Sequence, residues 1–229
     1  MKKKKHFIIY LIIVFVMVSL ITLFSINIYS KKKLDDEVKI ILKKDVSKSN
    51  FDTETKSLFR YSKIEKAIKE YMKDYSDNIK KANDIINDET IKKILSSSNY
   101  ESDGPQFDKS LKYLETKLKK FNDTITKLSK MSDKKEILKY IDKYELSNKY
   151  VEIYKNYMFG KDYSKDIENN KNIINKINDT GLKILNTDIS VLKLLKDNNE
   201  GWIVKEGSIH FYSKDLMEKY NELVEILNK

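Results

Sequence analysis

The spacing of apolar positions along most of the chain predicts amphipathic helices. Residues 107–131 show the clearest pattern, because apolar side chains alternate there at steps of four and three residues. The seam consists of Phe107, Leu111, Leu114, Leu118, Phe121, Ile125 and Leu128. Three heptads of this kind predict a helix that packs on another helix, either inside a bundle or in a coiled coil, and we favour packing inside a bundle. Similar spacing predicts a helix within residues 58–86.

Glycine, proline and serine positions predict where the helices are interrupted. Residues 96–106 hold the only proline and are predicted to form a loop. Gly160 is expected to end a short helix. A longer helix is predicted from Ser164 to Leu195, with Gly181 as a bend, because glycine is about 1 kcal/mol less favourable than alanine inside a helix.

The pattern changes near the C-terminus, where residues 201–212 predict a β-hairpin. The turn is expected at Glu206 and Gly207, since a two-residue loop ending in glycine is typical of tight hairpins. A last amphipathic helix is predicted over residues 213–228. The C-terminal part is therefore expected to be a hairpin followed by a helix.

The proposed turn fixes which side chains of the hairpin face each other. Trp202 is expected opposite Phe211, and Val204 opposite Ile209, with both pairs on one face. A lone two-stranded hairpin is only marginally stable in water. We therefore expect this apolar face to lie on the helices.

The N-terminal region contains a long uncharged segment, residues 7–29. As a helix it would extend about 35 Å, enough to cross a hydrocarbon core of about 30 Å. The apolar run is longer than that of a secretory signal peptide, and Ser25-Ile26-Asn27 is a poor cleavage site. We therefore favour a signal anchor over a cleaved signal peptide.

Lysines flank this segment on both sides, and their distribution predicts its orientation. They are Lys2, Lys3, Lys4 and Lys5 before the segment and Lys31, Lys32 and Lys33 after it. The first group and the amino terminus together slightly outnumber the second, which favours a cytoplasmic N-terminus. An intracellular anchor of the opposite topology is the alternative.

These observations predict a fold class and a division of the chain. The fold class is mainly α, with a single N-terminal transmembrane helix followed by a helical bundle, a small C-terminal β-hairpin and a final helix. The expected parts are a cytoplasmic head (residues 1–6), a transmembrane signal anchor (7–29), a juxtamembrane stalk (30–57) and an exported helical domain (58–229). The expected location is the cell membrane, with the C-terminal domain outside the cytoplasm.

Composition removes several kinds of chemistry. The chain of 229 residues has no cysteine, which excludes disulfides, thiolate nucleophiles and iron–sulfur sites. Only His6 and His210 are available, so histidine triads and multi-histidine metal sites are excluded as well. The five glycines never cluster into a phosphate-binding loop. We predict no catalytic residue, no cofactor and no metal.

The net charge of +10 does not indicate nucleic-acid binding. Arg60 is the only arginine among 45 basic residues, whereas nucleic-acid recognition favours arginine for its bidentate contacts. Joint enrichment in Lys, Ile, Asn and Tyr is typical of an AT-rich genome. We expect no nucleic-acid partner and a weak attraction of the lysine-rich surface to anionic lipid or wall polymer.

Four aromatic residues are candidates for an interaction surface: Trp202, Phe211, Tyr144 and Tyr154. Trp202 is the only tryptophan, and single aromatic anchors often carry binding energy at interfaces. The alternative is a core aromatic that fixes the hairpin, and we favour it for Trp202. The two tyrosines belong to a tyrosine-rich region that also contains Tyr140, Tyr150 and Tyr157.

The sequence predicts a non-enzymatic membrane protein that presents a helical interaction domain at the cell envelope. Its expected partners are the membrane and a protein of the envelope. One alternative is a ligand-binding or sensor domain that works with a separate membrane partner. Another is an envelope hydrolase or hydrolase regulator that uses carboxylates. A buried carboxylate pair would favour the last alternative, and a solid core without a cleft would contradict it.

Overall fold

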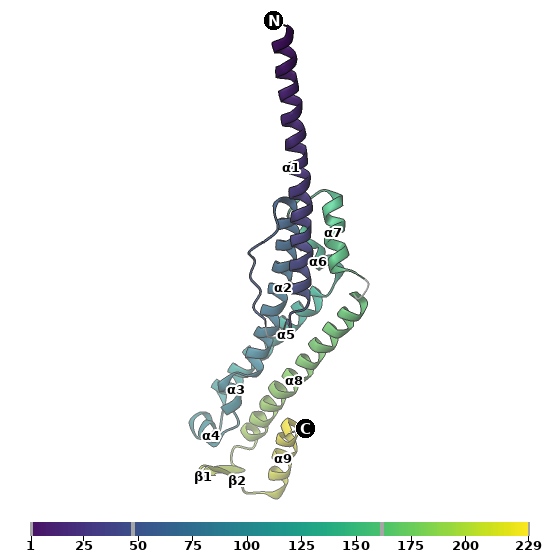
Figure 1. Cartoon of the computed structure of the whole chain (residues 1–229). Helices are drawn as coiled ribbons and strands as arrows, with labels where there is room; N and C mark the ends of the chain where they lie inside the picture. Colours follow the sequence, from purple (N-terminus) through teal and green to yellow (C-terminus); the bar gives the residue numbers. More distant parts are fainter. Residues whose placement is uncertain (1, 47–48, 161–162, 229) are drawn as a thin grey trace. The chain divides into compact units, whose positions relative to one another are not determined.

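The computed structural model describes residues 2–46, 49–160 and 163–228, with side chains for residues 12–46, 49–160 and 168–228. The helices are α1 (Lys2–Leu42), α2 (Phe59–Ile86), α3 (Glu89–Lys93), α4 (Ser97–Asp103), α5 (Asp108–Met131), α6 (Lys134–Asp142), α7 (Asn148–Met158), α8 (Tyr163–Asp197) and α9 (Lys214–Asn228). The strands are β1 (Trp202–Lys205) and β2 (Ser208–Phe211) (Figure 1). The predicted fold class is confirmed: a mainly helical chain with a long apolar N-terminal helix, a small hairpin and a final helix.

The chain forms two compact units. Unit 1 contains Met1–Ser76 and Lys134–Tyr163, and unit 2 contains Asp77–Asp133 and Ser164–Lys229. The expected stalk, residues 30–57, belongs to unit 1, while the expected exported domain is shared between the two units. The apolar pattern does not reveal this division, because α2 passes from one unit into the other without a break.

Unit 1 is built on the second half of α1 and the first half of α2. On α1, Leu34, Val38 and Ile41 are buried at intervals of four and three residues, as expected for one face of a helix. On α2, Ile64 and Ile68 are completely buried. The helix that begins in the apolar N-terminal segment therefore ends as a core element of unit 1.

Unit 2 has a core that joins α5, α8 and the hairpin. The buried α5 side chains Leu114 and Phe121 belong to the same apolar cluster as Leu185 and Leu192 of α8. The seam predicted on residues 107–131 thus lies mainly inside this unit, which is the arrangement expected for bundle packing.

The predicted loop at residues 96–106 is wrong for most of its length, because α4 occupies Ser97–Asp103. The Ser96 side chain caps this helix by accepting a hydrogen bond from the backbone N–H of Asn99. Tyr100 is buried and anchors the helix in the core of unit 2. The serine-rich sequence indicated a loop, but its first serine is a cap and Pro105 lies beyond the helix end.

The hairpin is confirmed in its register as well as its position. Trp202 pairs with Phe211, and Val204 pairs with Ile209. Trp202 is buried and its three apolar companions are half-buried, whereas the intervening residues of β2 are exposed. The apolar face therefore lies on unit 2.

The turn of the hairpin has the backbone geometry that its sequence predicts. Glu206 and Gly207 have φ values of 52° and 73°. Positive φ at both central residues is required by a type I′ turn, whose twist matches that of the flanking strands. Glycine takes the second position at little cost because it lacks a Cβ.

Gly181 permits close packing of two helices. The α8 helix continues through Gly181, and a Cβ built on this residue would collide with the ring of Phe121 on α5. The absence of a side chain at this position makes room for an aromatic ring, a role that the sequence did not predict. Glycine at this position is a packing requirement of unit 2.

Replacing Gly181 by alanine is expected to destabilise unit 2. Overpacking strain of about 3 kcal/mol should exceed the helix-propensity gain of about 1 kcal/mol, a net loss of about 2 kcal/mol. Urea unfolding of the full chain in mild detergent, followed by Trp202 fluorescence, measures the change. The control is Asn186→Ala on the exposed side of the same helix, which should be neutral or slightly stabilising. Equal midpoints for Gly181→Ala and the wild type would contradict the packing role.

Candidate functional site

The first candidate site is the apolar part of α1. This helix is long and apolar enough to cross a membrane, and its most apolar stretch buries none of its residues within the protein. That lack of burial separates it from an ordinary core helix, although a signal sequence has the same length and composition. Figure 1 shows this part of α1 extending away from the other helices of unit 1.

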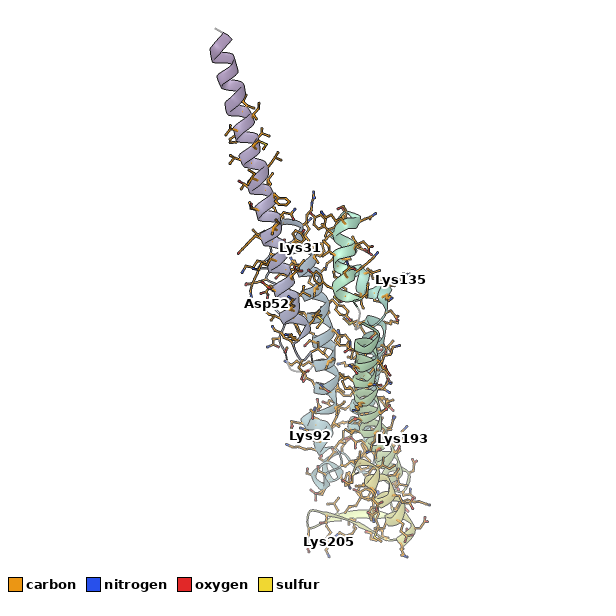
Figure 2. All side chains as sticks on the ribbon, turned by 45° about the vertical axis from the view of Figure 1, so that its right-hand side comes forward. Lys31, Asp52, Lys92, Lys135, Lys193 and Lys205 are labelled. Atoms are coloured by element: carbon orange, nitrogen blue, oxygen red, sulfur yellow. The ribbon has the colours of Figure 1, made fainter. Side chains whose placement is uncertain are left out.

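The structure describes the side chains of only the second group of lysines that flank the apolar segment. The side chains of Lys2, Lys3, Lys4 and Lys5 lie outside the described residues. Lys31 and Lys32 are exposed, and the Nζ of Lys33 lies 5.7 Å from the centre of the Tyr29 ring. Figure 2 labels Lys31 at the point where α1 meets the rest of unit 1. The second lysine group therefore surrounds α1 at the end of its apolar part.

Hydrogen bonds fix α1 to unit 1 directly after the apolar segment. The Ser30 hydroxyl donates to the carbonyl of Leu58 and accepts from its backbone N–H, both at 2.8 Å. One turn further on, the Tyr157 hydroxyl of α7 donates to the Asp35 carboxylate. These bonds connect α1 to two other elements of unit 1, so no flexible linker separates the apolar segment from the domain.

A buried cluster of charged side chains lies deeper in unit 1. The Glu65 side chain of α2 is completely buried, and its carboxylate accepts hydrogen bonds from the backbone N–H groups of Lys56 and Ser57 and from the Ser57 hydroxyl, at 2.6–3.1 Å. The Lys69 ammonium group lies 3.1 Å from the same carboxylate. Glu65 therefore holds the segment before α2 against the helix.

Lys69 links this cluster to three further groups. Its ammonium lies 3.7 Å from the Glu37 carboxylate of α1 and 3.3 Å from Asp52, which Figure 2 labels. It also donates to the carbonyl of Glu54. The second Glu37 oxygen accepts from the Lys56 ammonium at 2.7 Å. The cluster thus joins α1, α2 and the segment between them.

Burial and hydrogen bonding act in opposite directions on the carboxyl group of Glu65. Desolvation favours the neutral acid, but the hydrogen bonds from Ser57, Lys56 and Lys69 outweigh it and lower the pKa of Glu65. The pKa of Lys69 is raised, because its ion pairs with Glu65 and Asp52 outweigh its own desolvation. Both groups are therefore held in their charged forms.

A cavity of about 510 Å³ lies beside α1 at the end of its apolar part. Leu23, Ile26 and Ser30 line it from α1, Arg60 lines it from the start of α2, and Tyr150 lines it from α7. The Arg60 guanidinium lies 5.5 Å from the centre of the Tyr150 ring, within range of a cation–π contact. Sequence reasoning missed this site, because its residues come from three separate helices.

Trp202 and Phe211 belong to unit 2 and contribute to its core. Trp202 is 8% exposed, its ring stacks on Phe107 at 5.8 Å, and its indole N–H donates to the carbonyl of Leu195. Phe211 is half-buried with its ring 5.0 Å from that of Tyr220. These contacts are those of core aromatics that fix the hairpin, and they leave little of Trp202 for a partner.

Tyr144 and Tyr154 lie in unit 1. Tyr154 is completely buried, and its hydroxyl donates to the carbonyl of Ile137. Tyr144 is half-buried and donates to the Glu70 carboxylate, which also receives the Lys143 ammonium at 2.5 Å. The structure therefore does not gather the four aromatic candidates into one surface, since they are divided between the two units.

A buried carboxyl group in unit 2 was also missed by sequence reasoning. Asp188 of α8 is 3% exposed, and desolvation raises its pKa to about 7. Within the described residues no hydrogen bond or ion pair reaches its carboxylate. The pKa of Tyr100 is raised, mainly by burial and also by Tyr220 and Asp188. The hydroxyl groups of Tyr100 and Tyr220 lie 3.0 Å apart. An isolated aspartate in a helical pattern carries no sequence signal of burial.

The described part of the chain contains no group of three or more histidine, aspartate or glutamate side chains placed to hold a metal ion. Comparison with models of known protein families, with curated protein sequences and with solved structures returned no match. The physical features of the two units are therefore the basis for a functional proposal.

Proposed function

We propose that this chain is a non-enzymatic single-pass membrane protein whose helical domain acts as an interaction module at the cell envelope. The observation that carries the proposal is the continuity of α1. Its exposed apolar part continues, without a break in the helix, into a face whose residues Leu34, Val38 and Ile41 are buried in unit 1. A cleaved signal peptide would not need its helix to continue as a core element of the domain.

The proposed orientation places the N-terminus in the cytoplasm and both units outside it. Support comes from the lysines of residues 2–5, which exceed those of residues 31–33 by one charge before the amino terminus is counted. The exported units are therefore proposed to act through contacts at the envelope.

The buried carboxylates of unit 1 bear on the hydrolase alternative. Glu37 and Glu65 form a buried pair, but Lys69 lies between them and Lys56 also contacts both residues. A hydrolase of the two-carboxylate type needs one acid that retains its proton and one free carboxylate across a cleft. A pair that shares a buried ammonium group supports a structural role instead.

Protease treatment of intact, wall-stripped cells that produce the full chain with a C-terminal tag tests this proposal. We expect the tag to resist carbonate extraction with the membranes and to be removed by external protease. Protection of the tag inside intact cells would contradict the exported orientation. A tagged species in the medium would show a cleaved signal peptide and contradict the anchor.

A further inference from the structure

We propose that the cavity beside α1 binds the headgroup of an anionic phospholipid from the membrane in which the protein is anchored. This inference rests on the proposed membrane anchorage. Leu23 and Ile26 of its lining lie in the apolar segment, whereas Ser30 lies at the end of that segment. The cavity therefore spans the level at which acyl chains give way to headgroups.

The cavity continues a packing seam of α1. Leu23, Ile26 and Ser30 occupy the same helix face as Leu34 and Val38, because they follow at steps of three and four residues. Beyond Ser30 this face is covered by unit 1, while before Ser30 it borders the cavity. An apolar helix face of this kind, in a membrane, is covered by lipid.

The charge of the lining selects an anion. Arg60 and Lys63 are both exposed and both line the cavity, and none of its described lining residues is acidic. The first turn of α2 is also free of acidic residues. Neither cation forms an ion pair within the described residues. Two cations that lack an ion pair, beside an apolar wall, complement a phosphate group attached to acyl chains.

Phe59 adds an exposed apolar surface to the lining of the cavity. Phe59 is the first residue of α2 and is 68% exposed, and its neighbour Leu58 is 45% exposed. Ser30 holds Leu58 through two hydrogen bonds, so this exposed pair is fixed next to the apolar segment. Exposed Phe and Leu side chains are typical of protein surfaces that lie at the boundary between headgroups and acyl chains.

The test measures lipids retained by the full chain. The protein is equilibrated in neutral detergent with equal amounts of phosphatidylglycerol and phosphatidylcholine and analysed by native mass spectrometry. Each basic group near an anionic headgroup contributes roughly a fivefold gain in binding, so the two groups together predict about a 25-fold preference for phosphatidylglycerol. The double variant Arg60→Gln/Lys63→Gln should reduce this preference to about twofold or less.

The matched control is Lys135→Gln/Lys193→Gln, which removes the same charge from two exposed lysines that do not line the cavity, both labelled in Figure 2. It should retain the wild-type preference. Equal retention of both lipids by the wild type would overturn the proposal, as would an unchanged preference in the Arg60/Lys63 variant. Displacement of phosphatidylglycerol by millimolar inorganic phosphate would also overturn it, since the site would then recognise a free anion.

Failure of this inference is distinguishable from failure of the proposed anchorage. If the lipid site is absent but the anchor is real, the wild type and both double variants all resist carbonate extraction while the lipid preference is missing. If the anchor itself is absent, carbonate releases the full chain from membranes whatever its lipid preference. The two measurements together assign a negative result to one proposal or the other.

Discussion

Replacing Glu65 by alanine is expected to lower the free energy of unfolding of unit 1 by about 3–5 kcal/mol. The substitution leaves the Lys69 ammonium buried without its closest carboxylate and removes the acceptor for the backbone N–H groups of Lys56 and Ser57. Glu37 and Asp52 still attract Lys69, but Glu37 is more distant at 3.7 Å and Asp52 is largely exposed to solvent. A buried charge without its partner is among the most damaging single changes in a protein.

Hydrogen exchange locates this effect better than a global signal. The amides of Lys56 and Ser57 should exchange much faster in Glu65→Ala, because they lose their acceptor, and urea unfolding followed by far-UV circular dichroism should show an earlier transition. The control is Glu152→Ala, which removes an exposed ion pair with Lys155 from the same unit and should change stability by less than about 1 kcal/mol. The structural role of Glu65 is contradicted if the two variants unfold together.

A second variant separates the buried charge from the lost hydrogen bonds. In Glu65→Leu/Lys69→Met both charges are replaced by apolar side chains of similar size, which is often less costly than removing one partner. We expect this double variant to be more stable than Glu65→Ala, while the amides of residues 56 and 57 continue to exchange quickly. A double variant as unstable as Glu65→Ala would mean that the hydrogen bonds, rather than the ion pair, dominate.

Replacing Asp188 by asparagine is expected to stabilise unit 2 at pH 8 by about 2–4 kcal/mol and to have little effect near pH 4. The native pKa of Asp188 is raised to about 7 by burial, above the ordinary value of 3.8. Between these values the native state binds a proton that the unfolded state has released, so the contribution of Asp188 to stability falls as pH rises from about 4 to about 7. The full difference corresponds to roughly 4 kcal/mol.

Urea unfolding monitored by Trp202 fluorescence at several pH values measures this effect, because the only tryptophan lies in the core of unit 2. The difference between the variant and the wild type isolates Asp188 from other titrating groups. Asp197→Asn, an exposed change on the same helix, is the control and should show no pH-dependent difference of this size. A constant difference between pH 4 and pH 8 would contradict the buried-carboxyl interpretation.

The sequence predicted those parts of the fold that depend on local pattern. The period of three and four residues predicted α2 and α5, and the pair Glu206-Gly207 predicted the turn and thereby the register of Trp202 opposite Phe211. The local pattern was misleading where one residue type is compatible with two different structural roles. Ser96 is a helix cap rather than a loop residue, and Gly181 makes room for a ring rather than only weakening a helix.

The candidate sites were less predictable than the helices, because they depend on contacts distant in sequence. Glu65 and Glu37 resemble ordinary surface acids in a chain with 35 acidic residues, and their partners in the buried cluster come from α1, α2 and the segment between them. Composition identifies Arg60 as the only arginine, but the sequence does not predict that it lies beside α1. The apolar N-terminal segment and its flanking lysines were the candidate feature that the sequence alone indicated most directly.

The direct attachment of α1 to unit 1 has a mechanical consequence. From Ser30 to Leu42 the helix rises by roughly 20 Å, and its hydrogen bonds begin at Ser30. A domain attached in this way cannot move independently of the helix. In a bilayer, unit 1 would therefore stay at a constant distance from the membrane surface, and the membrane-spanning part of α1 would set its orientation. A partner anchored in the same membrane would diffuse only in the membrane plane and would always meet the same face of unit 1. This restriction raises the effective concentration of the two binding surfaces, although the intrinsic affinity between them is unchanged.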